Sequence, residues 1–136
     1  MKLIGMTKRG VRMTTRTCYL IPIGKPRMTK RDKWAKRPTV VKYRIFADAL
    51  RECMAGVDLS DVLFLGIVAY LPFPKSYSAT KRDALAGKLH RMKPDADNIA
   101  KAVMDALLPE DQGVAMMTVK KFWQDDGGPR LVVTVE

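Results

Sequence analysis

The chain has 136 residues, 47% of them hydrophobic, which is enough for one domain with a single core. Lysine and arginine outnumber acidic residues by 25 to 14, and the net charge of +11 favours a polyanionic partner. Nucleic acid is the first candidate, ahead of an anionic membrane or a merely solvated basic surface. One histidine and two cysteines argue against a zinc site, a His-based catalytic triad and a disulfide framework.

Cys18 and Cys53 both lie in apolar stretches, so we expect buried free thiols. Met1–Gly10 has no apolar core of a signal peptide, and the longest apolar run, Val62–Leu71, is too short to span a bilayer. We therefore expect a cytoplasmic protein with reduced thiols and no membrane association.

The first third of the chain predicts a flexible start, a strand and a basic loop. Residues 1–13 are expected to be flexible. Thr14–Ile23 is rich in strand-forming residues, and Pro22 marks an edge strand or its end. Gly24–Pro38 carries seven cations around Trp34, which suits phosphate contacts with base or sugar stacking. It equally suits a solvated loop whose tryptophan folds back onto the core.

The middle of the chain predicts a helix and a buried strand. Thr39–Ala55 has apolar positions 46, 50 and 54 in register, with 45, 49 and 53 beside them. We expect Thr39 to be the cap of this helix, and its end to lie near Gly56. Val62–Leu71 is almost wholly apolar, which predicts a central strand buried on both faces, where Gly66 marks close backbone approach or a bulge.

The last half predicts two helices and two strands. Ser78 caps a short helix that ends at Gly87, and His90 follows as a linker residue contacting backbone or nucleic acid. Asp97 is the expected N-cap of a helix over Asn98–Leu108. Val114–Trp123 and Leu131–Val135 predict an antiparallel hairpin.

These elements indicate one small α/β (α+β) domain over residues 1–136, with a mixed sheet of about four strands and two or three helices.

An acidic cluster precedes the helix over Asn98–Leu108. Asp95 and Asp97 are two residues apart, which allows both carboxylates to reach one Mg²⁺ ion if the backbone turns there. Lys101 is one helical turn from Asp97 and one from Asp105, so we expect the two acids to hold it charged and oriented towards a phosphate.

The same pattern also fits a well-capped helix with surface ion pairs, each contributing about 0–1 kcal/mol. Glu110 and Asp111 follow that helix, and acids at both of its ends favour the metal site.

Lys93–Leu107, KPDADNIAKAVMDAL, resembles the core motif of the RusA family of Holliday-junction resolvases, often carried by phages and prophages. Phe73–Ser78 and Gly24–Arg27 are similar to other parts of the family, so the resemblance runs from about residue 20 to the end. It implies a RusA-like fold and a Mg²⁺-dependent endodeoxyribonuclease, with Mn²⁺ as a substitute and no small-molecule cofactor. It also implies a homodimer that makes paired symmetric nicks in four-way DNA junctions during recombination and repair.

The resemblance assigns metal binding and catalysis to Asp95 and Asp97, and catalysis to Lys101. It gives the third metal-binding and catalytic acid to Asp111, in a Glu-Asp-Gln-Gly-Val segment that departs from the family pattern. Glu110 is the alternative third acid.

We expect basic side chains in the early loop and beside the acidic cluster to contact DNA: Lys25, Arg27, Lys30, Arg31, Lys33, Lys75 and Lys93. Val114–Met117 is a candidate dimer surface. Two other functions stay open, a junction-binding protein with weak or lost cleavage and an RNA- or ribosome-associated basic domain.

Overall fold

A computed structural model describes residues 13–27, 37–110 and 112–136. In chain order its elements are β1 (Thr14–Cys18), α2 (Pro38–Cys53), β2 (Phe64–Leu71), α3 (Ala79–Leu85), α4 (Ala96–Leu107), β3 (Met116–Trp123) and β4 (Arg130–Val135). The described residues thus form one mixed sheet and three helices, which confirms the predicted α+β class. No helix in these ranges is both long and apolar enough to cross a membrane.

The strands are arranged in the order β1-β4-β2-β3. β2 runs parallel to β3 and antiparallel to β4, while β1 pairs antiparallel with β4. The predicted hairpin between the last two strands is wrong, because β2 lies between them. β2 is the most apolar segment, and the central place in the sheet gives it a hydrogen-bonded neighbour on each side.

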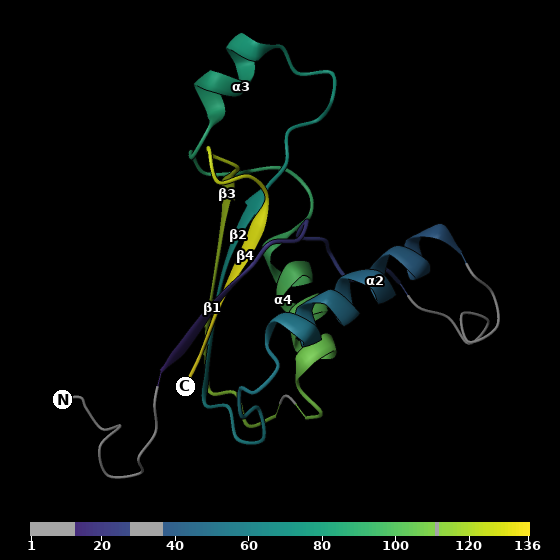
Figure 1. Cartoon of the computed structure of the whole chain (residues 1–136), viewed down its shortest axis with the longest axis vertical. Helices are drawn as coiled ribbons and strands as arrows, with labels where there is room; N and C mark the ends of the chain where they lie inside the picture. Colours follow the sequence, from purple (N-terminus) through teal and green to yellow (C-terminus); the bar gives the residue numbers. More distant parts are fainter. Residues whose placement is uncertain (1–12, 28–36, 111) are drawn as a thin grey trace.

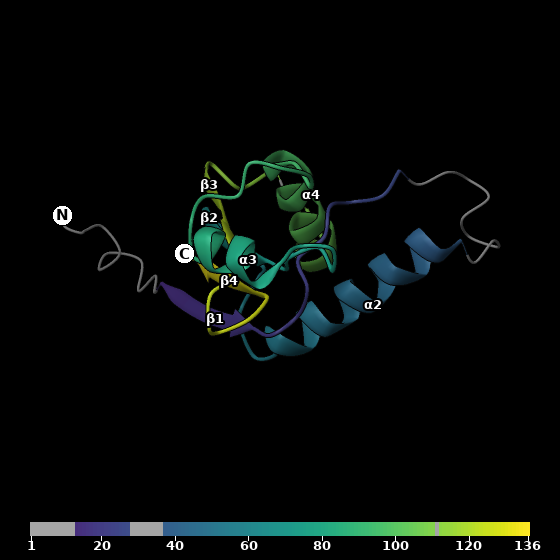
Figure 2. The same ribbon diagram turned by 90° about the horizontal axis from the view of Figure 1, so that it is seen from above.

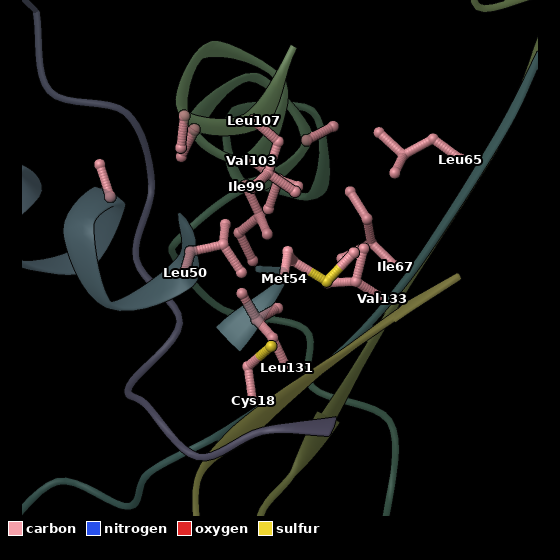
Figure 3. Close-up of a cluster of buried hydrophobic side chains, with 14 of the residues drawn as sticks. Cys18, Leu50, Met54, Leu65, Ile67, Ile99, Val103, Leu107, Leu131 and Val133 are labelled. Carbon is pink, nitrogen blue, oxygen red and sulfur yellow. The ribbon is translucent and has the colours of Figure 1, made fainter. Parts of the chain in front are cut away.

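Helices α2 and α4 cover one face of the sheet, so the described part of the chain has two layers (Figures 1 and 2). The core lies between these layers, where side chains of both helices meet side chains of β1, β2 and β4 (Figure 3). Its fully buried members include Leu50 and Met54 of the first helix region, Ile99 and Val103 of α4, and Leu65, Ile67, Leu131 and Val133 of the strands. Burying each such side chain contributes roughly 1.5–3 kcal/mol.

Strand β2 is central, as predicted, but only one of its faces is fully buried. Leu65, Ile67, Ala69 and Leu71 point into the core, whereas Phe64, Val68 and Tyr70 on the other face are half-buried. The pairing with β3 runs without interruption through Gly66, so there is no bulge there. A Cβ at Gly66 would lie 3.1 Å from the Phe64 ring and 3.4 Å from Thr118 Oγ1, which confirms the close approach.

Helix α2 begins one residue earlier than expected. Its N-cap is Arg37 and Pro38 is the first helical residue, so the prediction that Thr39 caps the helix is wrong. Proline suits this place because its φ is already helical and its missing N–H has no partner to lose. The helix ends at Cys53, with Gly56 following at a φ of +86°, close to the predicted end.

The buried stripe of α2 also differs in part from the predicted one. Phe46, Leu50 and Met54 are buried as expected, but Tyr43 and Ala47 join them and Ile45 is 65% exposed.

Cys18 and Cys53 form a disulfide in the structure, so the prediction of two free thiols is wrong. The bond joins the last residue of β1 to the last residue of α2, and the Cα atoms of the two cysteines are 5.8 Å apart. Both cysteines do belong to apolar faces, as predicted, but the fold brings these two faces together. Sequence spacing alone gives no sign of that proximity, since the two residues are 35 apart.

Candidate functional site

The acidic pair lies at the start of α4. Helix α4 begins at Ala96, so Asp95 is the N-cap and Asp97 lies in the first turn; the predicted cap at Asp97 is wrong. The Asp95 carbonyl accepts from the backbone N–H groups of Asn98 and Ile99 at 3.1 and 3.0 Å. Its carboxylate makes no capping hydrogen bond. The Asp95 and Asp97 side chains are exposed, which leaves their oxygens available to an external cation.

Lys101 lies one helical turn after Asp97 and is exposed. Within the described ranges, no ion pair shorter than 4.0 Å joins Lys101 to Asp97 or to Asp105, so the predicted pairing is wrong. Asp105 instead binds Lys25, whose Nζ is 2.6 Å from Asp105 Oδ2. The Lys101 ammonium is therefore available to an anion.

A cationic pocket of about 610 Å³ has described lining residues that include Asn98, which directly follows Asp97 in the chain: Lys25, Pro26, Arg27, Asn98 and Lys101. Three of these five residues are cations, and they come from two segments that are distant in the sequence. The pocket is therefore suited to a phosphate group close to the two carboxylates.

The segment that ends at residue 27 runs beside α4 (Figures 1 and 2). Its residues Lys25, Pro26 and Arg27 form one wall of the pocket. The Lys25 N–H donates to the Asn98 carbonyl at 3.2 Å. A Cβ at Gly24 would lie only 2.6 Å from Asn98 Nδ2, so glycine permits this close approach. The contact fixes Lys25 and Arg27 against the N-terminal half of α4.

Lys25 is held more tightly than a surface lysine. Besides its bond to Asp105, its Nζ lies 4.8 Å from the centre of the Tyr43 ring, and its side chain is 17% exposed. The Tyr43 hydroxyl donates to the Ala102 carbonyl at 3.3 Å, which ties α2 to α4. Burial raises the pKa of Tyr43, and the nearby Lys25 charge partly opposes that rise. The arrangement leaves Arg27 and Lys101 as the more accessible cations of the pocket.

Lys121 on β3 holds the loop that leads to the acidic pair, a role that sequence reasoning missed. Its Nζ donates to the Met92 carbonyl at 2.6 Å and to the Pro94 carbonyl at 2.8 Å. The pairing of Leu89 with Phe122 fixes the same loop from the other end. Strand alternation places Lys121 and Lys120 on opposite faces, but it does not reveal which of them meets the loop.

His90 contacts the backbone, which is one of the two alternatives expected for it. It is buried, its ring lies 4.2 Å from that of Trp123, and its Nδ1 accepts from the Met92 N–H at 3.4 Å. Burial lowers the pKa of His90, and the charge of Lys121 lowers it further. The imidazole is therefore neutral near pH 7 and belongs to the support of the loop.

The predicted third acid lies outside the described residues, since it is Asp111. Glu110, the alternative, follows the opposite end of α4 (Figure 1) and its Oε2 accepts from Gln112 Nε2 at 3.2 Å. The 12 residues of α4 correspond to a helix length of about 18 Å. Among the described residues, no group of three or more His, Cys, Asp or Glu side chains is close enough to hold a metal ion.

The predicted DNA-contacting residues divide into three groups. Lys25 and Arg27 line the pocket, whereas Lys75 and Lys93 are exposed on the segment between β2 and α4. The remaining three lie outside the described residues, together with the tryptophan of the same loop: Lys30, Arg31, Lys33 and Trp34.

The family model described as endodeoxyribonuclease RusA matches residues 20–136. This range includes the acidic pair, Lys101, the whole cationic pocket and Lys121. No curated protein sequence matches the chain.

Proposed function

The chain belongs to the endodeoxyribonuclease RusA family, and from that premise we propose that it resolves four-way DNA junctions by paired symmetric nicks, using Mg²⁺, in recombination and repair. The observation that carries the proposal is the arrangement at the start of α4. Asp95 and Asp97 expose two carboxylates that have no hydrogen-bond or ion-pair partner among the described residues, and the next residue, Asn98, lines a pocket that holds three cations.

The acidic pair fits a magnesium ion. Mg²⁺ prefers oxygen ligands, keeps several waters, and is often bound through one or two carboxylates together with substrate phosphates. Asp95 and Asp97 supply two such carboxylates at a helix start, and Asp111 is the candidate for a third. When bound, the ion supplies positive charge for the phosphate and a more acidic water. Mn²⁺ is the expected substitute.

The pocket side chains would hold the phosphate group of the cleaved bond. Lys101 and Arg27 offer positive charge to its oxygens, which would stabilise the charge that develops during attack. Asn98 offers amide N–H donors from the same wall. Lys25, partly neutralised by Asp105, mainly positions Arg27 and the pocket wall.

We further propose that the chain acts as a homodimer, because two symmetric nicks need two equivalent active sites and a twofold axis supplies them. Met116 and Met117, 55% and 44% exposed, give the predicted Val114–Met117 surface an apolar character. This supports that surface as a contact between copies.

We propose the cytoplasm of a bacterial cell as the site of action, with the gene carried by the host, a phage or a prophage, because DNA junctions form there. Thiols are mostly kept reduced in that compartment. The Cys18–Cys53 bond would then form only under oxidising conditions.

One observation favours a second function, junction binding with weak or lost cleavage. Glu110 is separated from Asp95 by the length of α4, so it does not complete a three-acid site within the described residues. A protein of this kind would keep the pocket and the basic surface but cut slowly.

A cleavage assay on a synthetic four-way junction, with and without Mg²⁺, separates the two functions. We expect symmetric nicks only with the metal, and Asp97→Asn should abolish cutting while junction binding persists. Asp126→Asn is the matched control, since Asp126 is an exposed carboxylate in the turn before β4. Binding without cutting by the unmodified protein, in Mg²⁺ and in Mn²⁺, would favour the second function. Full cutting by Asp97→Asn would exclude the proposed metal site.

A further inference from the structure

Residues 72–91, which we call the α3 arm, project beyond the end of the sheet where β2 finishes (Figure 1). The arm consists of a turn, the seven-residue helix α3 and a returning segment. Ser78 Oγ accepts from the Lys81 N–H at 3.2 Å and Gly87 has a φ of +74°, so the helix begins and ends as the sequence predicts. No residue of α3 is buried, so the helix contributes nothing to the core.

The base of the arm is nevertheless firmly attached. Three rings surround the buried Trp123, with centroid distances of 5.4 Å for Phe73, 5.8 Å for Tyr77 and 4.2 Å for His90. The returning segment pairs with the end of β3, where the Trp123 N–H donates to the Lys88 carbonyl at 2.8 Å. Such aromatic and backbone contacts hold the arm in a fixed direction.

Basic side chains dominate the surface of the arm. The arm has six exposed or half-buried charged residues, of which five are cations and one is an acid: Lys75, Lys81, Arg82, Lys88, Arg91 and Asp83. Arg82 binds the Tyr77 carbonyl at 3.1 Å, and Lys81 lies 3.9 Å from the Tyr77 ring centre, so these two support the arm itself. In the described part of the chain, Lys75, Lys88 and Arg91 have no ion-pair partner.

Lys75, Lys88 and Arg91 flank α3 on an arm whose helix adds nothing to the core. Unpaired like charges there do not stabilise the fold, so a polyanion explains them better. We propose that the α3 arm binds the sugar–phosphate backbone of the duplex next to the cleaved phosphate. The inference rests on the proposed function and adds to it a second DNA-contacting surface. Only one large apolar side chain of the arm is strongly exposed, Leu89, so an apolar face for a bilayer is lacking.

The chain limits how far this contact lies from the cleaved bond. Lys88 and Asp95 are seven positions apart, and an extended chain of that length spans at most about 25 Å. At 3.4 Å per base-pair step, the Lys88 end of the arm lies within about seven base pairs of the nick.

The test compares two double variants of equal charge by junction binding across a salt series. Lys75→Gln with Lys88→Gln removes two arm cations, and Lys42→Gln with Lys120→Gln removes two exposed cations from α2 and β3. Each lost phosphate contact lowers the slope of log affinity against log salt by about 0.9. We therefore expect the arm variant to bind at least tenfold more weakly in low salt, with a slope lower by nearly two. The control should stay within threefold of the unmodified protein.

A second readout uses junctions with arms of 15 and of five base pairs. The unmodified protein should bind the short-armed junction more weakly, and the arm variant should bind both equally. Arm and control variants with equal affinity and equal cutting would overturn the arm proposal and leave the proposed function intact. An unmodified protein that binds but never cuts would overturn the function and leave the arm measurement valid. Loss of binding to anionic lipid vesicles, with DNA binding unchanged, would overturn the arm proposal in favour of a membrane.

Discussion

Lys121 gives the clearest case of a single side chain supporting the site from a distance. It donates two hydrogen bonds, of 2.6 and 2.8 Å, to carbonyls directly ahead of Asp95. Hydrogen bonds from a charged group contribute about 1.5–3 kcal/mol. We expect Lys121→Met to lower the free energy of unfolding by about 1–3 kcal/mol and the cutting rate at saturating junction by at least tenfold, because the acidic pair loses its placement.

Lys120→Met is the matched control, since Lys120 is the exposed neighbour on the opposite face of β3. Single-turnover cutting and urea unfolding measure the two effects separately. Junction affinity should change by less than threefold in the Lys121 variant, because Lys121 is not a pocket residue. Unchanged cutting in this variant would remove the positioning role.

His90 predicts how stability depends on pH. Burial lowers its pKa in the folded state below the ordinary value of 6.5, so the unfolded chain binds a proton that the folded chain does not. Stability from this residue is therefore complete above about pH 7 and declines as pH falls through 6.5. We expect urea midpoints to decrease between pH 7.5 and pH 5.5.

His90 is the sole histidine of the chain, so no other imidazole contributes to that slope. His90→Asn should unfold more easily at pH 7.5 yet show a flatter dependence on pH. An equal slope in both proteins would mean that other groups cause it.

At the residue scale, the sequence predicted the groups of the site but not all of their partners. Asp95, Asp97 and Lys101 form a local pattern, and the structure places Asp95 at the N-cap of α4 and the other two in its first half. The spacing of one helical turn predicts that Asp105 forms an ion pair with Lys101. Its actual partner, Lys25, is 80 residues away, and only the packing of the early segment against α4 brings them together.

At the scale of helices and strands, composition did not reveal the disulfide that joins β1 to α2. The Cys18–Cys53 bond closes a loop of 35 residues, which includes the pocket-lining segment. Closing such a loop restricts the unfolded chain and stabilises the fold by about 3–4 kcal/mol in the chain-entropy treatment. We expect dithiothreitol to lower the free energy of unfolding by about this amount in the oxidised protein.

The variant with Cys18→Ser and Cys53→Ser is the control, and its stability should not respond to the reductant. Thiol titration of the unfolded protein establishes the oxidised state beforehand. Equal stability with and without reductant, in a protein shown to be oxidised, would contradict the prediction.

Most elements follow from local patterns, whereas their pairing does not. Apolar runs, together with the glycine, proline and capping residues between them, predicted the strands and helices. Ser78 and Gly87 predicted the two ends of α3 to within about one residue. Local patterns do not give the order of the strands, in which β4 and β2 take the two interior positions. A six-residue connection that could close a hairpin instead passes over the end of β2, where Gln124 N–H donates to the Leu71 carbonyl at 2.8 Å.

At the scale of the whole molecule, three features meet at one end of the sheet. The acidic pair, the cationic pocket and the α3 arm all depend on contacts with the second half of β3 or the first half of α4. The net charge of +11 predicted a polyanionic partner without locating it. Under the proposed function, the partner lies where packing brings the early segment to α4 and directs the arm beyond the sheet.

Paired nicking makes a prediction about the assembly. A homodimer of this 15.3 kDa chain carries two active sites, one for each cut strand. The test is to co-express the unmodified chain with tagged Asp97→Asn and to isolate mixed dimers by the tag. If each chain cuts one strand, mixed dimers should nick only one strand of the junction, and resolved duplexes should be nearly absent.

Mixed dimers with Asp126→Asn in place of Asp97→Asn are the control, and they should cut both strands. Sedimentation of the unmodified protein should give twice the chain mass at the concentrations used for cutting. A protein that acts as a monomer would co-purify with no untagged chain, and mixing it with Asp97→Asn would dilute activity without changing the ratio of nicked to resolved product. That result would contradict the twofold arrangement while leaving the metal site and the pocket intact.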